Sequence, residues 1–254
     1  MPHADLSGPH DPIEAEHTPQ AIEQRLAGGP PHSYLRDWVY GAIDGTVTTF
    51  AVVAGVMGAE LSTSVIVILG VANLFADGFS MAASNYLGTR AEDERREKLR
   101  RAEHEHIRRH PHGEREEIRQ IFAAKGFEGE DLERAVKTIT SDVERWVDTM
   151  LTDEHGVSLV GPDPFRAAWA TFWAFVLVGA VPLLAFIYPG LAIDRAFTLS
   201  SIMTGAAFFA VGALKSRFVD QVWWRGGLGT LAVGGLAAVI AYSVGVILRG
   251  IVGS

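Results

Sequence analysis

Three long runs of the sequence contain no Asp, Glu, Lys or Arg: 167–193, 196–214 and 226–248. A helix needs about 20 apolar residues to cross the hydrocarbon core of a membrane, so each run is long enough to span it. Two further apolar stretches, 38–59 and 63–88, are each interrupted by one aspartate. The sequence therefore predicts an all-α integral membrane protein with five transmembrane helices.

A segment of opposite character separates the second predicted span from the third. Residues 89–156 hold more than half of the chain's 30 acidic residues and most of its 22 lysines and arginines. Such a segment cannot lie in lipid, yet its apolar residues recur three or four positions apart, as in a helix. We expect three helices, at about 89–110, 114–125 and 130–154, the first of which continues the second span into water.

Lysine and arginine positions predict the orientation of the chain. They crowd the end of the second span and the loop before the fifth, whereas the loop Glu60–Ser62 has none. Because such residues favour the cytoplasmic side, we place the N-terminus and the charged segment in the cytoplasm. The acidic, polar N-terminus does not resemble a secretory signal, which favours a bacterial plasma (inner) membrane, or a vacuole-like membrane in a eukaryote.

This reading divides the chain into four parts. They are a cytosolic tail (1–35), transmembrane helices one and two (36–88), a cytosolic helical metal-binding domain (89–160) and transmembrane helices three to five (161–254). Pro182 would kink the third span if it does not simply pack there.

Composition excludes several classes of function. The chain has no cysteine, which removes disulfides, thiolate metal sites and cysteine nucleophiles. A net charge of −8 argues against nucleic acid as a partner. The sequence offers neither a phosphate-binding glycine loop nor a Ser/His/Asp grouping. We expect no enzyme, no ATP-driven pump and no permanently bound cofactor.

Asp44 is the unusual residue of the first span. A charged side chain at mid-membrane costs at least ~2.5 kcal/mol, and such residues usually line an ion path or pair with a partner. Gly41 and Gly45 flank it at a spacing that lets two helices approach closely. This pattern indicates a site between helices or between subunits. An aspartate at the helix end, or one paired with a cation, is the structural alternative.

The second span carries a polar stripe. Asn73, Asp77, Met81 and Asn85 are four residues apart and so lie on one helix face. Carboxylate oxygen suits hard cations and thioether sulfur suits softer ones, so the mixture suits a borderline divalent metal such as ferrous iron. A packing role for Met81 is the alternative.

The charged segment offers two ligand-type side chains on one face of each predicted helix. The pairs are Glu103 with His106, Glu114 with Glu117, and Met150 with Glu154. Together they could point toward one metal centre. Alternatively, they are solvated helix faces with ordinary ion pairs.

Two stretches, DGTVTTFAVVAGV and GVANLFADGFSMAASNYLGTRAE, together with the acidic insert, resemble the vacuolar iron transporter family over about residues 35–250. The resemblance implies dimers of five-span subunits. It also implies exchange of cytosolic ferrous iron, and often manganese, for protons along a path at the dimer interface.

The resemblance also assigns residues. It places the membrane-site aspartate at Asp44 and the span-two methionine at Met81. The cytosolic ligands that it implies are Glu103, Glu114, Glu117 and Glu154, with Met150 beside the last. Two positions depart from the pattern. His106 stands where a glutamate is expected, and Asn73 stands where a carboxylate can occur, with Asp77 one turn on.

The expected function is proton-coupled export of ferrous iron, and of manganese, from the cytosol. The charged helices would collect metal, with other divalent ions such as Zn2+ also able to bind there. Asp44 would be shared between metal and proton at the interface of a homodimer in the lipid bilayer. The alternatives are a metal-binding or metal-sensing membrane protein without transport, a membrane-anchored di-iron oxidase, and a calcium exchanger, which Met81 disfavours.

Overall fold

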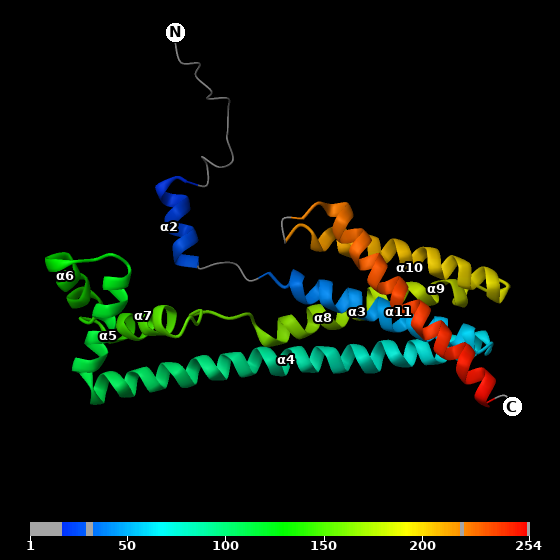
Figure 1. The fold of residues 1–254 in the computed structure, drawn as a ribbon, viewed down its shortest axis with the longest axis horizontal. Coiled ribbons are helices and arrows are strands. Elements are labelled where there is room, and N and C mark those ends of the chain that lie inside the picture. Colours follow the sequence, from blue (N-terminus) through cyan, green and yellow to red (C-terminus); the bar gives the residue numbers. More distant parts are fainter. Residues whose placement is uncertain (1–16, 29–32, 219–220, 253–254) are drawn as a thin grey trace, which may run out of the picture. The chain divides into compact units, whose positions relative to one another are not determined.

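The computed structural model describes residues 17–28, 33–218 and 221–252, and every regular element in these ranges is a helix (Figure 1). The helices are, in chain order, α2 (Pro19–Gly28), α3 (Leu35–Gly58), α4 (Thr63–Arg109), α5 (Pro111–Ala124), α6 (Gly129–Ile139), α7 (Val143–Thr149), the π-helix η1 (Met150–Glu154), α8 (Pro164–Gly179), α9 (Val181–Ile187), α10 (Ile193–Lys215) and α11 (Trp223–Val252). The predicted all-α class is confirmed.

The chain divides after Ser33 into two units, so α2 is described by itself. Much of the predicted tail, residues 1–16 and 29–32, lies outside the described residues. The second unit, from Tyr34 onward, contains all the other helices.

Among the described residues, four helices are long and apolar enough to cross a membrane: α3, α4, α10 and α11. A fifth span exists if α8 and α9 are one broken helix, since they meet with a bend of 40° at Ala180. Pro182 lies in the first turn of α9, where its missing N–H costs that helix nothing, but it has no N–H to donate back to α8, so α8 does not continue through it as one regular helix. These helices make the chain an integral membrane protein.

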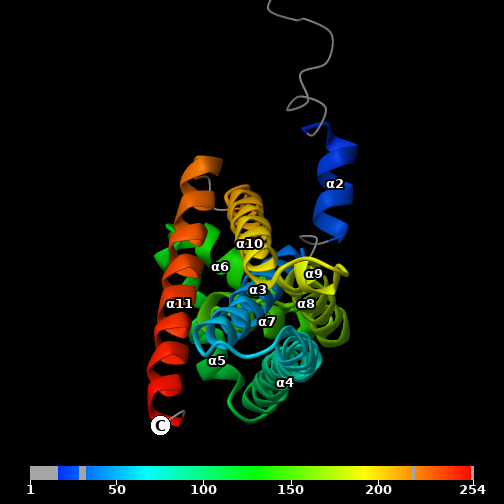
Figure 2. The same ribbon diagram turned by 90° about the vertical axis from the view of Figure 1, so that its right-hand side faces the viewer.

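Helix α3 is the centre of the membrane part, with contacts to α4, α8, α9, α10 and α11 (Figure 2). Its glycines permit this. A Cβ atom at Gly41 or Gly45 would overlap the backbone of α8, at Thr171 and Phe175 respectively. The close helix contact predicted from these glycines therefore lies within one chain and not between subunits. Asp44, between the glycines, lies on the exposed side of α3.

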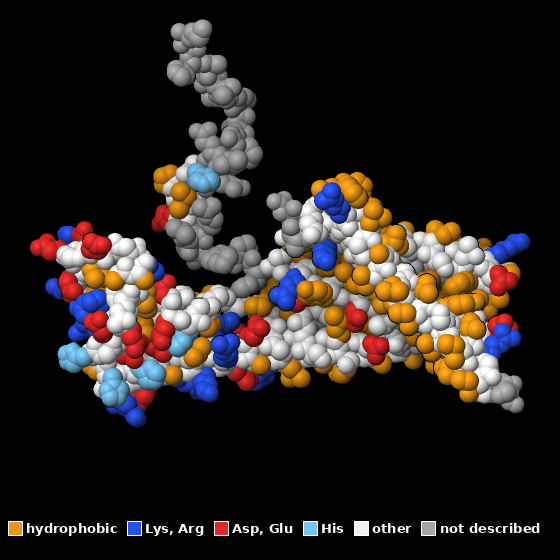
Figure 3. Space-filling model, viewed as in Figure 1, with side chains coloured by type: hydrophobic (Ala, Val, Ile, Leu, Met, Phe, Trp, Pro, Cys, Tyr) orange, Lys and Arg blue, Asp and Glu red, His pale blue; other side chains and the backbone are white. Residues whose placement is uncertain are grey.

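The distribution of side chains on the surface agrees with a membrane position for α3 and α8 to α11. Hydrophobic side chains cover the part of the chain around α3, α10 and α11, whereas charged ones gather around α5, α6 and α7 (Figure 3). Exposed apolar residues such as Phe79, Leu177 and Leu236 cost little if they face lipid instead of water.

Helix α4 is 47 residues long and runs without a break from the apolar stretch into the charged one. The predicted continuation of the second span is confirmed. A second apolar core, which includes Ile107, Ile118, Trp146 and Met150, packs α5, α6, α7 and η1 around the end of α4.

The prediction of one helix over 130–154 is wrong. Helix α6 ends at Ile139, and Asp142 starts a new helix because its side chain accepts a hydrogen bond from the backbone N–H of Arg145 at 2.8 Å. The chain then widens into the π-helix η1 from Met150. The predicted helix at 114–125 begins earlier, at Pro111, a residue well suited to a first helical turn.

Candidate functional site

Six ionisable side chains of α4, α5, η1 and the residue that follows η1 form what we call the acidic cluster. Its members are Glu103, His106, Glu114, Glu117, Glu154 and His155. The chain turns back within one residue, His110, between α4 and α5. This turn brings the first turn of α5 close to the last turns of α4.

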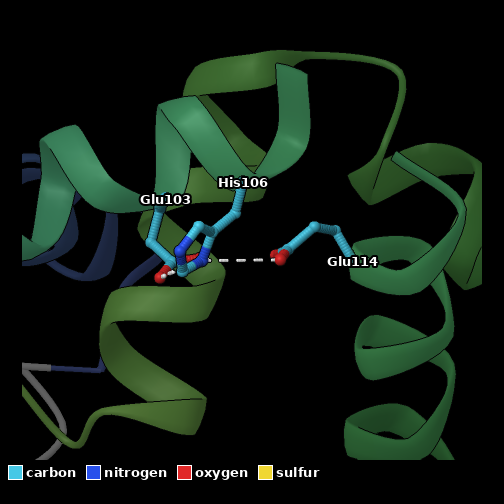
Figure 4. A group of neighbouring side chains, drawn as sticks. All are labelled: Glu103, His106 and Glu114. Atoms are coloured by element: carbon cyan, nitrogen blue, oxygen red, sulfur yellow. Dashed lines mark ion pairs between the residues drawn. The ribbon is translucent and has the colours of Figure 1, made fainter. Parts of the chain in front are cut away.

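Glu103, His106 and Glu114 form the first part of the acidic cluster (Figure 4). His106 Nδ1 lies 3.7 Å from Glu103 Oε1 and 3.6 Å from Glu114 Oε1. The imidazole therefore sits between two carboxylates of different helices. The arrangement matches the predicted approach of these helix faces.

Both carboxylates are buried and incompletely hydrogen-bonded. Glu103 is 2% exposed and Glu114 is 6% exposed. Within the part of the chain that the structure describes, the Oε2 atom of each is buried without a hydrogen-bond partner. A buried polar atom without a partner is unfavourable, and a cation bound between the two carboxylates would satisfy both oxygens.

The acidic cluster is electrostatically crowded. Burial, together with the negative charges of Glu117, Glu103 and Glu154, raises the pKa of Glu114 to about 7. Burial also raises the pKa of Glu154, and nearby Glu103 and Glu117 add to that shift. A divalent cation bound here would relieve this repulsion, and its binding would then displace protons from these carboxyl groups.

Glu154 and His155 approach Glu103 from the other side. His155 Nε2 lies 3.0 Å from Glu103 Oε1 and 3.7 Å from Glu154 Oε2. The ligand atoms of these three residues all lie within 4.8 Å of one another. His155 was not among the residues predicted from the sequence. Its position next to Glu154 was the only sign in the sequence of a role as a ligand. The direction of its imidazole side chain depends on the π-helix η1 before it.

Two predicted ligands, Glu117 and Met150, belong to neither of these three-residue groups. Glu117 is exposed, although its charge acts on both Glu114 and Glu154. Met150 is fully buried and packs in the apolar core with Ile118.

In the membrane part, α3 and α4 present a second group of polar side chains. Asp44 and Asp77 are both exposed, and Asp77 is near enough for its charge to act on Asp44. Asn73 Nδ2 donates to Thr48 Oγ1 at 3.4 Å, and the Thr48 hydroxyl donates to the Asp44 carbonyl oxygen at 2.9 Å. The polar stripe of α4 thus faces the turn of α3 that holds Asp44.

The other end of this stripe is also tied to its neighbours. Asn85 Nδ2 donates to Asp37 Oδ1 at 2.9 Å and to Thr171 Oγ1 at 2.8 Å. Met81, one turn before Asn85, is half-buried against the apolar core. Hydrogen bonds at both ends fix α3 against α4, with the two membrane aspartates between them. We call Asp44, Asn73, Asp77 and Met81 the membrane stripe.

Comparison with known proteins relates both groups to one family. A model of the VIT family matches residues 35–246, from the start of α3 into the last turns of α11. The chain belongs to the VIT family. The match includes every residue of the acidic cluster and of the membrane stripe, and it confirms the resemblance found in the sequence.

Three relatives within the VIT family illustrate the similarity. The chain is 31% identical to a vacuolar iron transporter of Toxoplasma gondii, over 87% of this chain and 76% of the relative. It is 32% identical to vacuolar iron transporter 1 of Eucalyptus grandis, over 83% and 84% of the two chains. It is 30% identical to vacuolar iron transporter 1 of Arabidopsis thaliana, over 85% and 86%.

Proposed function

We propose that this VIT-family protein moves ferrous iron, and also manganese, out of the cytosol across a membrane in exchange for protons. Its relatives are named as iron transporters, which supports transport over catalysis. The observation on which the proposal rests is the pair Asp44 and Asp77, two exposed carboxylates close enough to interact on two helices that are apolar enough to span a membrane.

The proposed topology has five spans, with α8 and α9 counted as one. The N-terminus and the region from α5 to η1 face the cytoplasm, as the lysine and arginine distribution favours, in a bacterial plasma membrane. The acidic cluster would then collect ferrous iron, manganese or Zn2+ from the cytosol, because in the described residues one oxygen of each buried carboxylate, Oε2 of Glu103 and of Glu114, has no hydrogen-bond partner.

Asp44 would bind metal and proton in turn. As an anion it would hold a divalent cation together with Asp77 and the Met81 thioether, replacing part of the hydration shell of the ion. As a neutral acid it would be far less costly to keep in the membrane. Metal release would thus accompany proton uptake. Asn73 would set the position of this turn through Thr48.

A second subunit would cover the membrane stripe. Carboxylates exposed to lipid are unfavourable, so the face of α3 and α4 that holds Asp44 and Asp77 fits the interface of a homodimer. The chain has no cysteine, so single cysteines can be introduced cleanly. Tyr40→Cys, one turn from Asp44, should cross-link between copies with a flexible bis-maleimide. Leu236→Cys on α11 should not, and the reverse pattern would place the interface elsewhere.

Transport itself is tested in proteoliposomes with ferrous iron outside, an acidic interior and anaerobic conditions. Wild-type protein should accumulate iron and make the interior more alkaline. Asp44→Asn should lose both effects, whereas Asp194→Asn, an exposed acid in the first turn of α10, should keep them. If wild-type protein binds iron without accumulating it, the transporter proposal fails and a metal-sensing role takes its place.

A further inference from the structure

We propose that His155 is a metal ligand and that it makes the acidic cluster select nitrogen-preferring divalent metals over those that prefer oxygen alone. The pocket consists of His155, Glu103 and Glu154. The inference deepens the proposed function, because it rests on the acidic cluster collecting the transported metal.

The pocket has the geometry of a ligand set. His155 Nε2 is 3.0 Å from Glu103 Oε1 and 3.7 Å from Glu154 Oε2, and all three ligand atoms lie within 4.8 Å of one another. The His155 side chain is 26% exposed, so an ion can reach the pocket from water. Glu103 is 2% exposed.

An independent observation indicates that a cation belongs here. Glu103 Oε2 is buried and has no hydrogen-bond partner, although Oε1 of the same carboxylate contacts His155. One imidazole cannot satisfy both oxygens of this group. A metal ion between Glu103, Glu154 and His155 would supply the missing partner.

The π-helix explains how neighbouring residues reach one pocket. In an α-helix, consecutive side chains point in different directions and do not meet. Here the backbone N–H of His155 donates to the Met150 carbonyl at 3.1 Å, a five-residue spacing that widens the turn. Both Glu154 and His155 then approach Glu103. Single π turns of this kind occur frequently at functional sites.

A contact outside the pocket holds this turn in place. Lys125 Nζ, just after α5, forms an ion pair with Asp153 Oδ2 at 2.6 Å. The turn that carries His155 is therefore tied to the helix that carries Glu114. The pocket is built by the fold and does not depend on one flexible side chain.

His155 changes which metals the cluster prefers. Imidazole nitrogen suits zinc, iron, cobalt and nickel, whereas magnesium and calcium are satisfied by carboxylate and water; manganese, which the carboxylates of the cluster would also bind, gains less from a nitrogen ligand. His106 already gives the adjoining pocket, which shares Glu103, one nitrogen. With His155 each pocket offers one nitrogen, so magnesium and calcium compete poorly.

The competing explanation is that His155 only donates a hydrogen bond to Glu103. His155→Gln separates the two roles, because a glutamine amide can donate to the same carboxylate but is a weak ligand for Zn2+ or Co2+. His104→Gln is the matched control, since His104 lies on α4 next to Glu103 and pairs with Glu144 outside the pocket.

The experiment is titration of the purified full-length protein in detergent with Zn2+ and Mn2+, together with the visible absorption of bound Co2+. We expect His155→Ala and His155→Gln each to weaken Zn2+ binding by roughly tenfold or more and to alter the Co2+ bands, with a much smaller effect on Mn2+. The His104 variant should match wild type.

Two results would overturn the proposal. Wild-type Zn2+ affinity and Co2+ bands in His155→Gln would leave His155 as a hydrogen-bond donor only. Equal losses for Zn2+ and Mn2+ in His155→Ala and His155→Gln would make its role structural. These titrations need no transport, so failure of the proposed function and failure of this inference are distinguishable.

Discussion

Glu114 should make metal binding by the acidic cluster depend on pH around neutrality. Burial and neighbouring acids raise its pKa to about 7. Glu114 is therefore about nine-tenths ionised at pH 8 and about one-tenth ionised at pH 6. A metal ion needs the ionised form, so the Kd should rise by about tenfold between pH 8 and pH 6 through Glu114 alone.

The stability of the metal-free protein should change with pH in the opposite direction from metal binding, so it should be greater at low pH. The folded pKa of Glu114 lies above its ordinary value of 4.5, so the protonated carboxyl favours the fold. This stabilisation is fully present below about pH 4.5 and is lost as the pH rises through about 7. Bound metal reverses the trend, because it stabilises the ionised carboxylate.

The assay is calorimetric titration with Mn2+ at pH 6 and pH 8, for wild type, Glu114→Gln and Glu116→Gln. Glu114→Gln should bind metal more weakly, and its Kd should lack the roughly tenfold rise between pH 8 and pH 6 that comes from Glu114. Glu116, which pairs with Arg119 on the same helix, is the control and should leave the dependence unchanged. The reasoning is refuted if Glu114→Gln keeps the wild-type pH dependence.

The helix contacts give two further predictions. Gly45→Ala places a Cβ about 2.9 Å from Phe175 Cα, so it should lower the stability of the protein in detergent by about 1–3 kcal/mol. Gly55→Ala is the control and should be tolerated, because the nearest atom to its Cβ is 3.5 Å away. Equal melting temperatures for the two variants would contradict the packing described. Asp142→Ala removes the N-cap of α7 and should lower the stability of that helix by about 1 kcal/mol. Amide exchange near Arg145 should then be faster, and unchanged exchange would mean that the cap contributes nothing.

Long-range features of the fold were predictable from composition. Charge-free runs revealed α10, α11 and the pair α8 and α9, because lipid tolerates few charges. The continuation of α4 into water was also predictable, because helical periodicity persists across the change from apolar to charged residues.

The details of the acidic cluster were predictable only in part. Helical spacing brought out Glu103, His106 and Glu114, whose approach needs one turn between two helices. It missed His155, because the π turn at η1 depends on packing against α4 and α5. It also assumed one helix where Asp142 caps a new one.

The membrane stripe shows the same limit. The spacing of Gly41 and Gly45 predicted a close helix contact, yet only the fold reveals that α8 of the same chain fills it. Because α8 packs against the glycine face of α3, the face that carries Asp44 stays exposed. A pattern within one helix does not contain this information.

The most direct test of the account compares Asp44→Asn with Glu114→Gln in proteoliposomes over a wide range of ferrous iron concentrations. We expect Asp44→Asn to abolish uptake at every concentration while the acidic cluster still binds metal. Glu114→Gln should take up iron slowly at low iron concentration and at the wild-type rate at high concentration, because the role of Glu114 is only to collect the metal. Undiminished uptake by Asp44→Asn, or a complete loss in Glu114→Gln at saturating iron, would contradict the division of roles between membrane stripe and acidic cluster.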